Sequence, residues 1–191
     1  MSIILASASP RRKELMEMLG IKNLLIIPAE GEEEQVPGRG AEETVLALSL
    51  AKAREVAAKH GSDLVIAADT VVCIDGEILG KPKNREDAER MLRRLSGREH
   101  LVYTGVTLTK NGESRSAAEM TAVRFRKLSE GEISAYVATG EPMDKAGAYG
   151  AQGLASLFVE GISGDFFNVM GLPLCRLGRM LEDFGVVLLS E

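Results

Sequence analysis

The chain has few of the residues that characterise disulfide-rich secreted proteins, metal-binding proteins or proteins that stack on nucleic-acid bases. Its 191 residues include only two cysteines, no tryptophan and 4% aromatic residues. Cys73 and Cys175 lie far apart in apolar surroundings, without metal-ligand spacing, so we expect two buried free thiols. Free thiols are typical of a reducing compartment, which predicts a cytoplasmic protein.

Long apolar runs are also missing, and we expect no signal peptide. No apolar run approaches the ~20 residues that cross a bilayer, and the first residues lack the basic region and cleavage site of a signal peptide. The net charge is −5, and aromatic platforms for stacking bases are scarce. We therefore expect neither a membrane nor a nucleic acid as partner.

The composition that is present belongs to an ordinary folded protein. Hydrophobic residues make up 45% and charged residues 27% of the chain, and no repeat or low-complexity linker divides it. We expect residues 1–191 to form a single elongated domain.

Turn signals and periodicity predict strands alternating with helices at first, and hairpins in the middle. Asp75-Gly76 and Asn111-Gly112 are strong hairpin turns, and Ser129 to Glu132 forms a capping box. Strands are expected over residues 3–6, 24–27, 64–68, 71–74, 77–79, 100–110 and 113–125, and near 157–160 and 167–170; helices are expected over 10–19, 42–60, 84–95 and 129–139 and from 173. This order predicts an α/β fold with a mixed, twisted central sheet flanked by helices.

The stretch Ser7-Ala8-Ser9-Pro10-Arg11-Arg12 reads as the end of a strand, a tight turn and the start of a helix. Ser9 suits the N-cap and Pro10 the first helical position. Unpaired N–H groups of the first turn, the helix dipole, two hydroxyls and two guanidinium groups together favour an anion. The stretch therefore predicts a phosphate clamp.

Carboxylates are prominent in two places. Asp69 follows the apolar residues 64–68, and open α/β sheets place ligands at such strand ends. The alternative is a turn or cap, which the strand-like residues after it disfavour. Four glutamates between Glu30 and Glu34 repel one another unless a cation lies near, and a solvated loop is the alternative. Glu32 and Asp69 can supply the one or two carboxylates that Mg²⁺ takes.

Two lysines stand out by their surroundings. Lys52 has apolar or small neighbours in the long helix, although an ordinary surface lysine is the alternative. Lys81 lies between Gly80 and Pro82, which hold it extended on a stiff loop. A turn lysine without a special role is equally compatible with that pattern.

A glycine-spaced loop from Glu141 to Gly153 leaves room for the close approach of a ligand. Gln152 can read the edge of a base, because its amide both donates and accepts hydrogen bonds. The alternative is a purely structural loop, but ordered loops of this length are more often functional.

Taken together, these segments closely resemble the Maf family of nucleoside triphosphate pyrophosphatases over nearly the whole chain. The resemblance rests on SASPRRKEL (residues 7–15), AADTVV (67–72), LGKP (79–82), EPMDKAGAY (141–149) and GDFFNVMGLP (164–173). Each segment is weak alone, whereas their order and spacing make the resemblance specific.

The resemblance implies a Maf- or ITPase-like fold with two lobes around a cleft, and it is usual for such folds to form homodimers. It also implies cleavage of a nucleoside triphosphate substrate between the α and β phosphates, with a divalent cation, Mg²⁺ or Mn²⁺. The implied residues are Asp69 as general base, Lys52 and Lys81 on the phosphates, Ser7, Ser9 and Arg12 in the phosphate clamp, and Glu32 with Asp69 on the metal. Which of Glu30, Glu32 and Glu33 holds the metal stays open.

The chain is most similar to the branch of the family that is associated with dTTP and UTP. Arg11, Thr70 and Gln152 stand where a branch associated with 7-methyl-GTP differs, so the resemblance implies that they select the base. Ala151 departs from the pattern, which usually has a bulkier aliphatic residue. We expect an enzyme that clears dTTP and UTP, or modified pyrimidine nucleotides, from the pool. The alternative is a nucleotide-binding regulator of cell division with little turnover.

Overall fold

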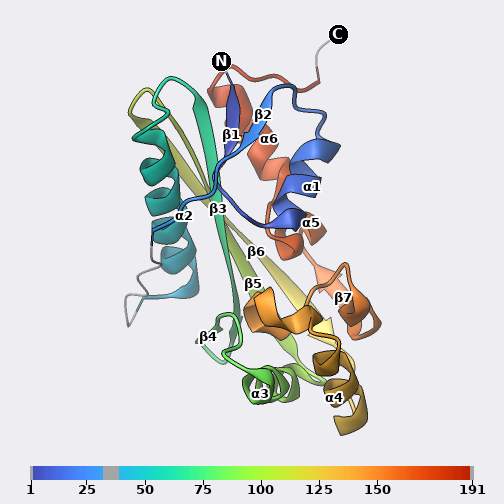
Figure 1. The fold of residues 1–191 in the computed structure, drawn as a ribbon. Helices are drawn as coiled ribbons and strands as arrows, with labels where there is room; N and C mark the ends of the chain where they lie inside the picture. Colours follow the sequence, from blue (N-terminus) through green and yellow to red (C-terminus); the bar gives the residue numbers. More distant parts are fainter. Residues whose placement is uncertain (1, 32–38, 190–191) are drawn as a thin grey trace.

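One mixed sheet of seven strands runs through the length of the protein, with helices on both of its faces (Figure 1). The computed structural model describes residues 2–31 and 39–189. The strands follow the order β2-β1-β3-β5-β6-β7, and β4 pairs with β3. The β1–β2 and β1–β3 pairs are parallel and the others antiparallel. The expected α/β fold with a mixed sheet is confirmed.

The elements have the following bounds. The strands are β1 (Ile3–Leu5), β2 (Leu24–Ile26), β3 (Leu64–Ile74), β4 (Glu77–Leu79), β5 (Glu99–Lys110), β6 (Glu113–Phe125) and β7 (Val159–Ser163). The α-helices are α1 (Pro10–Met18), α2 (Ala41–Ala57), α3 (Arg85–Leu95), α4 (Glu130–Ala138), α5 (Phe166–Met170) and α6 (Leu174–Asp183). Short 3₁₀ turns follow α4: η1 (Glu141–Asp144), η2 (Ala146–Ala148) and η3 (Leu154–Leu157). No helix in the part of the chain that the structure describes is long and apolar enough to span a bilayer.

Local turn and cap chemistry behaves as the sequence predicts. Asp75 and Asn111 take positive φ angles of 54° and 51°, as type I′ hairpin turns require. Asn84 Oδ1 accepts the N–H of Asp87 and caps α3. Ser129 begins α4 with both bonds of the capping box.

Three expectations are wrong. Residues 64–68 and 71–74 form one continuous strand, β3, so Asp69 lies inside a strand and not at its end. Residues 167–170 are helical in α5, because Asp165 Oδ1 accepts the N–H of Phe167 at 2.8 Å and starts a helix there.

The third concerns the cysteines. Both cysteines are free, as expected, but Cys175 is exposed because α6 turns that position away from the core. Cys73 is half-buried.

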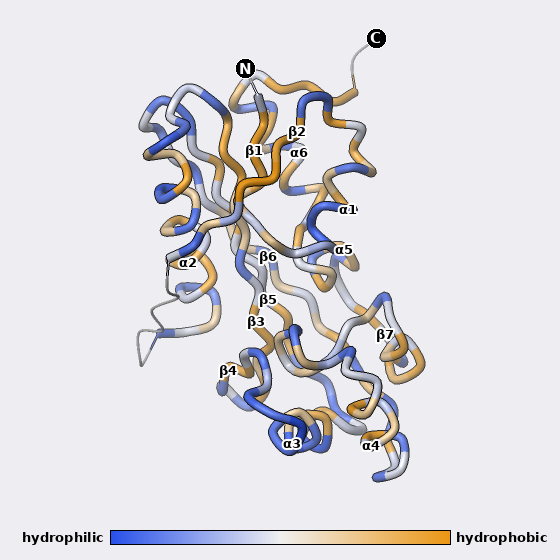
Figure 2. Tube along the Cα trace, viewed as in Figure 1, coloured by the Kyte–Doolittle hydropathy of each residue, from blue (hydrophilic) through white to orange (hydrophobic). Residues whose placement is uncertain are grey.

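The core is divided by the sheet. Along β1 and β3, alternate side chains face opposite sides, as the period of a strand requires. One set, including Ile4 and Val65, packs against α2, whereas the other, including Leu5 and Ile66, packs against α1 and α6. Figure 2 shows hydrophobic residues along β1 and the neighbouring β2.

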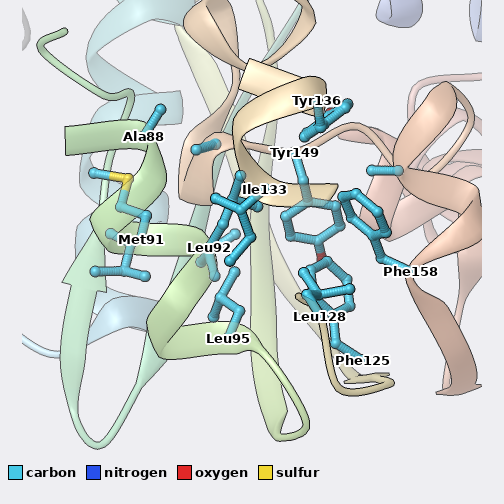
Figure 3. Packing of buried hydrophobic residues seen from close by; sticks show 14 of the residues in the cluster. Ala88, Met91, Leu92, Leu95, Phe125, Leu128, Ile133, Tyr136, Tyr149 and Phe158 are labelled. Carbon is cyan, nitrogen blue, oxygen red and sulfur yellow. The ribbon is translucent and has the colours of Figure 1, made fainter. Parts of the chain in front are cut away.

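A second hydrophobic centre lies at the opposite end of the sheet, between α3 and α4. Aromatic rings from distant segments meet there, with Tyr149 against Phe125 and Phe158 near both (Figure 3). The two ends of the protein therefore have separate hydrophobic clusters and share the long strands β3, β5 and β6.

Candidate active site

The site is a cleft at an open edge of β3. On this edge β1 pairs with residues 64–66 and β4 with residues 72–74, whereas β5 occupies the opposite edge. Within the described ranges, residues 67–71 therefore have no strand beside them on the first edge. A cleft of ≈ 1300 Å³ opens here, somewhat above the roughly 300–1,000 Å³ of common ligand pockets.

All the expected site residues within the described ranges line this one cleft. They are Ser7, Ser9, Arg11, Arg12, Lys52, Asp69, Thr70, Lys81 and Gln152. They come from the β1–α1 turn, α2, β3, the loop after β4 and the glycine-rich loop, so the fold gathers segments that are far apart in sequence. The structure thus places these residues around one cleft, whereas the role of each residue stays a prediction.

Asp69 and Thr70 use the two faces of β3. Neighbouring residues in a strand point to opposite faces, so Asp69 faces α2 and Thr70 faces α1. Asp69 is buried, with 6% of its surface exposed, and Lys52 Nζ donates to its Oδ1 at 2.6 Å. Because the strand edge is open here, the cleft reaches both faces.

The close packing of α2 on the sheet sets the position of Lys52. Gly105 on β5 pairs with Asp69, and a Cβ at Gly105 would collide with the backbone carbonyl of Val45 in α2. Ser49 lies one turn further along α2 and shares a hydrogen bond of 2.9 Å with Thr107 on β5. Both residues are fully buried. These contacts fix the helix that carries Lys52 at a short distance from β3.

Arg12 is the centre of the β1–α1 turn. Its Nε donates to the carbonyl of Gly171 at 2.7 Å, its Nη1 to Ser7 Oγ at 3.3 Å and its Nη2 to Thr70 Oγ1 at 3.0 Å. Ser9 occupies the N-cap of α1 but makes no capping bond with its side chain. Instead Ser7 Oγ accepts the N–H of Ser9 at 3.2 Å, because the Ser7 hydroxyl lies over the start of the helix.

The two neighbouring arginines have different partners. Arg11 Nη1 lies 3.7 Å from Asp144 Oδ2 in η1, and Arg12 is the one that contacts Thr70. The proposed selection of the base by Arg11 together with Thr70 thus has no direct contact behind it in the structure. The pairing brings the glycine-rich loop against the clamp.

The loops that carry Lys81 and Gln152 are joined through the backbone. The N–H of Gly147 donates to the carbonyl of Gly80 at 3.0 Å, immediately before Lys81. Lys81 and Gln152 are both exposed on the wall of the cleft. Neither side chain is enclosed, which leaves both able to meet a ligand.

Sequence reasoning missed further cleft residues. Lys145 lines the cleft, and its Nζ donates to Asp144 Oδ1 and to the carbonyl of Glu141, both at 2.6 Å. The signal was available, because Lys145 and Asp144 lie in the segment EPMDKAGAY. Arg39 also lines the cleft.

The cleft is cationic although the protein is acidic overall. Among the described residues that line it, the charged side chains are basic at Arg11, Arg12, Arg39, Lys52, Lys81 and Lys145, and acidic at Asp69, Glu77 and Asp144. The whole chain carries −5. A concave surface lined by cations favours a small polyanion.

Asp69 is the buried carboxylate among the described residues of this cleft, and it can serve a divalent cation. A hard oxygen ligand beside room for phosphate oxygens and water fits Mg²⁺ or Mn²⁺, which keep much of their shell outside the protein. Glu32 and Glu33 lie outside the described residues, and Glu30 is exposed. Among the residues that are described, no group of three or more histidine, cysteine or carboxylate side chains could hold a metal ion. The predicted pair of Glu32 and Asp69 stays a prediction.

Tyr149 connects the cleft to the aromatic cluster. It lines the cleft and is buried, and its hydroxyl lies 2.8 Å from His100 Nε2. Burial lowers the pKa of His100 to about 4 and raises that of Tyr149. Both groups are therefore neutral near pH 7, and their contact joins the glycine-rich loop, which contains Tyr149, to His100 on β5.

These features define an α/β protein with a polyanion-binding cleft and a carboxylate held among cations. Residues 2–184 match the family described as "Maf-like protein". The chain belongs to this family.

Two relatives agree with that assignment, and a solved structure shares the fold. The chain is 52% identical to a protein of Methanosarcina barkeri over 99% of this chain and 97% of the relative. It is 51% identical to one of Symbiobacterium thermophilum over 96% of this chain and 94% of the relative. Both relatives are named "dTTP/UTP pyrophosphatase". A HAM1 protein from Coxiella burnetii shares the fold, with a TM-score of 0.55, 16% identity and coverage of 96% of this chain and 99% of that one.

Proposed function

We propose that this protein is a dTTP/UTP pyrophosphatase, which hydrolyses these nucleotides to the monophosphate and pyrophosphate. The observation that carries the proposal is the Lys52–Asp69 pair, a buried carboxylate held at 2.6 Å from an ammonium in a cationic cleft. The chain matches relatives of that name along almost its full length.

The reaction that suits this arrangement is attack of water on the α-phosphorus. A triphosphate brings about four negative charges, which the surrounding lysine and arginine side chains offset. Asp69 takes a proton from water as the new bond to the α-phosphorus forms. The bond from the α-phosphorus to the bridging oxygen breaks, and pyrophosphate leaves with the bonding electrons. A divalent cation held by Asp69, with a glutamate of the acidic loop, would supply further charge neutralisation.

The other cleft residues divide between the phosphates and the base. Lys52 and Lys81 add positive charge along the phosphate chain, while Ser7 and Arg12, beside the Ser9 N-cap, form the clamp at the start of α1. Gln152 can pair with the O4 and N3–H edge that uracil and thymine share. Cytosine presents an amino group at that edge and would be a poor substrate.

Two wider expectations accompany the proposal. The free cysteines Cys73 and Cys175 suit a reducing compartment, which supports a cytoplasmic nucleotide-pool enzyme. A homodimer stays a prediction, and the mass of the purified protein by light scattering tests it.

The experiment is a substrate panel with product identification. Purified protein with Mg²⁺ is incubated with dTTP, UTP, CTP, GTP and ATP, and the products are separated by ion-exchange chromatography. We expect dTTP and UTP to be converted fastest, to monophosphate and pyrophosphate. Binding of UTP without turnover would instead support the regulatory alternative, and release of a nucleoside diphosphate would contradict the proposed bond.

A further inference from the structure

We propose that a buried hydrogen-bond chain turns the Thr70 hydroxyl so that it meets a ligand only as an acceptor, and that Thr104 is the residue that positions it. This inference rests on the proposed function in one respect, because it takes the group that meets Thr70 to be the base of a pyrimidine nucleotide. It concerns the direction of protons along a chain of oxygen atoms.

The chain begins in the core, at a group that can only accept. Thr104 Oγ1 donates to the backbone carbonyl of Asn168 at 3.0 Å, and Thr104 has no exposed surface. A hydroxyl has one proton and a carbonyl has none. If the Thr104 proton pointed elsewhere, two buried oxygen lone pairs would face each other. The Thr104 proton is therefore committed to Asn168.

The direction of the next bond follows. Thr70 pairs with Thr104 across β3 and β5, and their Oγ1 atoms lie 2.8 Å apart. Because the proton of Thr104 is already used, Thr70 must donate its own proton to Thr104. Arg12 Nη2, which can only donate, occupies one lone pair of Thr70 at 3.0 Å. What remains on the Thr70 oxygen is a single lone pair.

Ser7 provides the contrast on the same guanidinium group. Its Oγ accepts from the N–H of Ser9 at 3.2 Å and from Arg12 Nη1 at 3.3 Å. These two bonds use both lone pairs of Ser7 and leave its proton free to donate. Arg12 thus lies between two cleft hydroxyls of opposite polarity, with Ser7 suited to a phosphate oxygen and Thr70 suited to an N–H group.

The acceptor of the chain is itself held in place. Asn168 is fully buried in α5, and its Nδ2 donates to the carbonyl of Val102 at 3.1 Å and to Thr121 Oγ1 at 3.0 Å. The N–H of Gly171 donates to the Asn168 carbonyl at 2.9 Å. The carbonyl that receives the Thr104 proton therefore cannot rotate away, and the polarity of the chain is built into the fold.

The chemistry that an acceptor-only hydroxyl recognises is an imide N–H. Uracil and thymine carry a proton on N3, whereas cytosine has a lone pair at that position. A lone pair on Thr70 attracts the N3–H of uracil or thymine, which it would share with the amide oxygen of Gln152, and repels the N3 lone pair of cytosine. It also repels phosphate oxygens. We assign Thr104 as a positioning residue for the choice of base, acting through Thr70.

The test compares Thr104→Val with Thr104→Ser. Valine has nearly the shape of threonine but cannot accept the Thr70 proton, which then rotates and becomes available to a ligand. Serine keeps the hydroxyl and serves as the matched control. The dissociation constants of the α,β-methylene analogues of UTP and CTP are measured by titration calorimetry with Mg²⁺, so that the readout does not require turnover.

We expect the valine variant to lose about tenfold of the wild-type preference for the uridine analogue, about the effect of one hydrogen bond. The serine variant is expected to keep that preference. Unchanged preference in Thr104→Val, or equal loss in both variants, would overturn the inference. So would a wild-type protein that binds neither analogue. Absence of UTP hydrolysis with normal discrimination in binding would count against the proposed function alone.

A double-mutant cycle with Thr70→Val distinguishes an effect of Thr104 on Thr70 from a general loss of structure in the cleft. If Thr104 acts through Thr70, the double variant Thr70→Val/Thr104→Val discriminates as poorly as Thr70→Val and no worse. Additive losses would overturn the inference. Should Thr104→Val fail to fold, Thr104→Ala takes its place in the same cycle, and the same two outcomes decide.

Discussion

Lys52 Nζ lies 2.6 Å from Asp69 Oδ1 and joins the middle of α2 to the middle of β3, on the wall of the cleft. The lysine side chain is 19% exposed and the aspartate side chain 9%. An ion pair this enclosed serves two purposes. In the proposed reaction it would supply a carboxylate and a cation, and in the fold it ties a helix to the sheet beneath it.

Asp69→Asn should abolish most turnover and leave the fold intact. The amide has the same size but cannot take a proton from water, and loss of a general base costs roughly 10²–10⁴-fold. We expect kcat for UTP to fall by that factor and the melting temperature to fall by a few degrees, because the ion pair with Lys52 is weakened. Turnover near that of the wild type would show that Asp69 is not the base.

Lys52→Gln should lower stability as well as activity. Removing one partner of an enclosed pair leaves the other charge uncompensated, and for this partly exposed pair we expect a loss of about 1–3 kcal/mol. The double variant Lys52→Gln/Asp69→Asn should recover part of that loss, since no unpaired charge remains. Urea unfolding of the four proteins measures the coupling, and strict additivity would contradict it.

Gly105→Ala should disrupt the placement of α2. A Cβ there meets the backbone of Val45, which cannot move without shifting the helix that carries Lys52. We expect about 1–3 kcal/mol of destabilisation, the usual cost of overpacking, together with reduced kcat. Gly178→Ala in α6 is the matched control, because open space surrounds that position. It should be neutral or stabilising by up to about 1 kcal/mol, and equal effects of the two changes would refute the packing argument.

His100 should make the protein sensitive to acid. Its pKa is about 4 in the folded protein against 6.5 as the ordinary value, because burial disfavours the charged ring. Between these values the unfolded chain binds a proton that the folded chain does not, so stability falls as the pH falls from 6.5 through 4. The loss is roughly 3 kcal/mol at about 1.4 kcal/mol per pKa unit.

His100→Gln tests this directly. Glutamine keeps a polar partner for the Tyr149 hydroxyl but does not titrate. Guanidinium unfolding at several pH values should give a shallower decline for the variant between pH 6.5 and 4, whatever its stability at pH 7. Parallel curves for the two proteins would rule out His100 as the source.

The sequence was a good guide where structure is decided locally. A type I′ hairpin turn requires positive φ angles, which Asp75-Gly76 and Asn111-Gly112 adopt readily. Ser129 and Glu132 form the capping box at the start of their own helix. The apolar run at residues 167–170 was ambiguous, because strand and buried helix share that pattern. Asp165, as an N-cap, decides for the helix.

Tertiary contacts account for what the sequence did not predict in the site. Arg11 and Arg12 are adjacent and chemically alike, and nothing local indicates that one reaches Asp144 and the other Thr70. The continuity of β3 through Asp69 depends on β5 pairing along its full edge. The cleft nevertheless gathers the described residues that the motifs singled out, because the β1–α1 turn, α2, β3 and two loops all reach this edge of β3.

³¹P NMR of UTP hydrolysis in ¹⁸O-labelled water shows which phosphorus atom the water attacks. Each bond from ¹⁸O to phosphorus shifts the resonance slightly upfield, so one spectrum identifies the products and locates the label. Attack at the α-phosphorus gives UMP that carries ¹⁸O, together with unlabelled pyrophosphate. Label in pyrophosphate, or formation of UDP and inorganic phosphate, would contradict it.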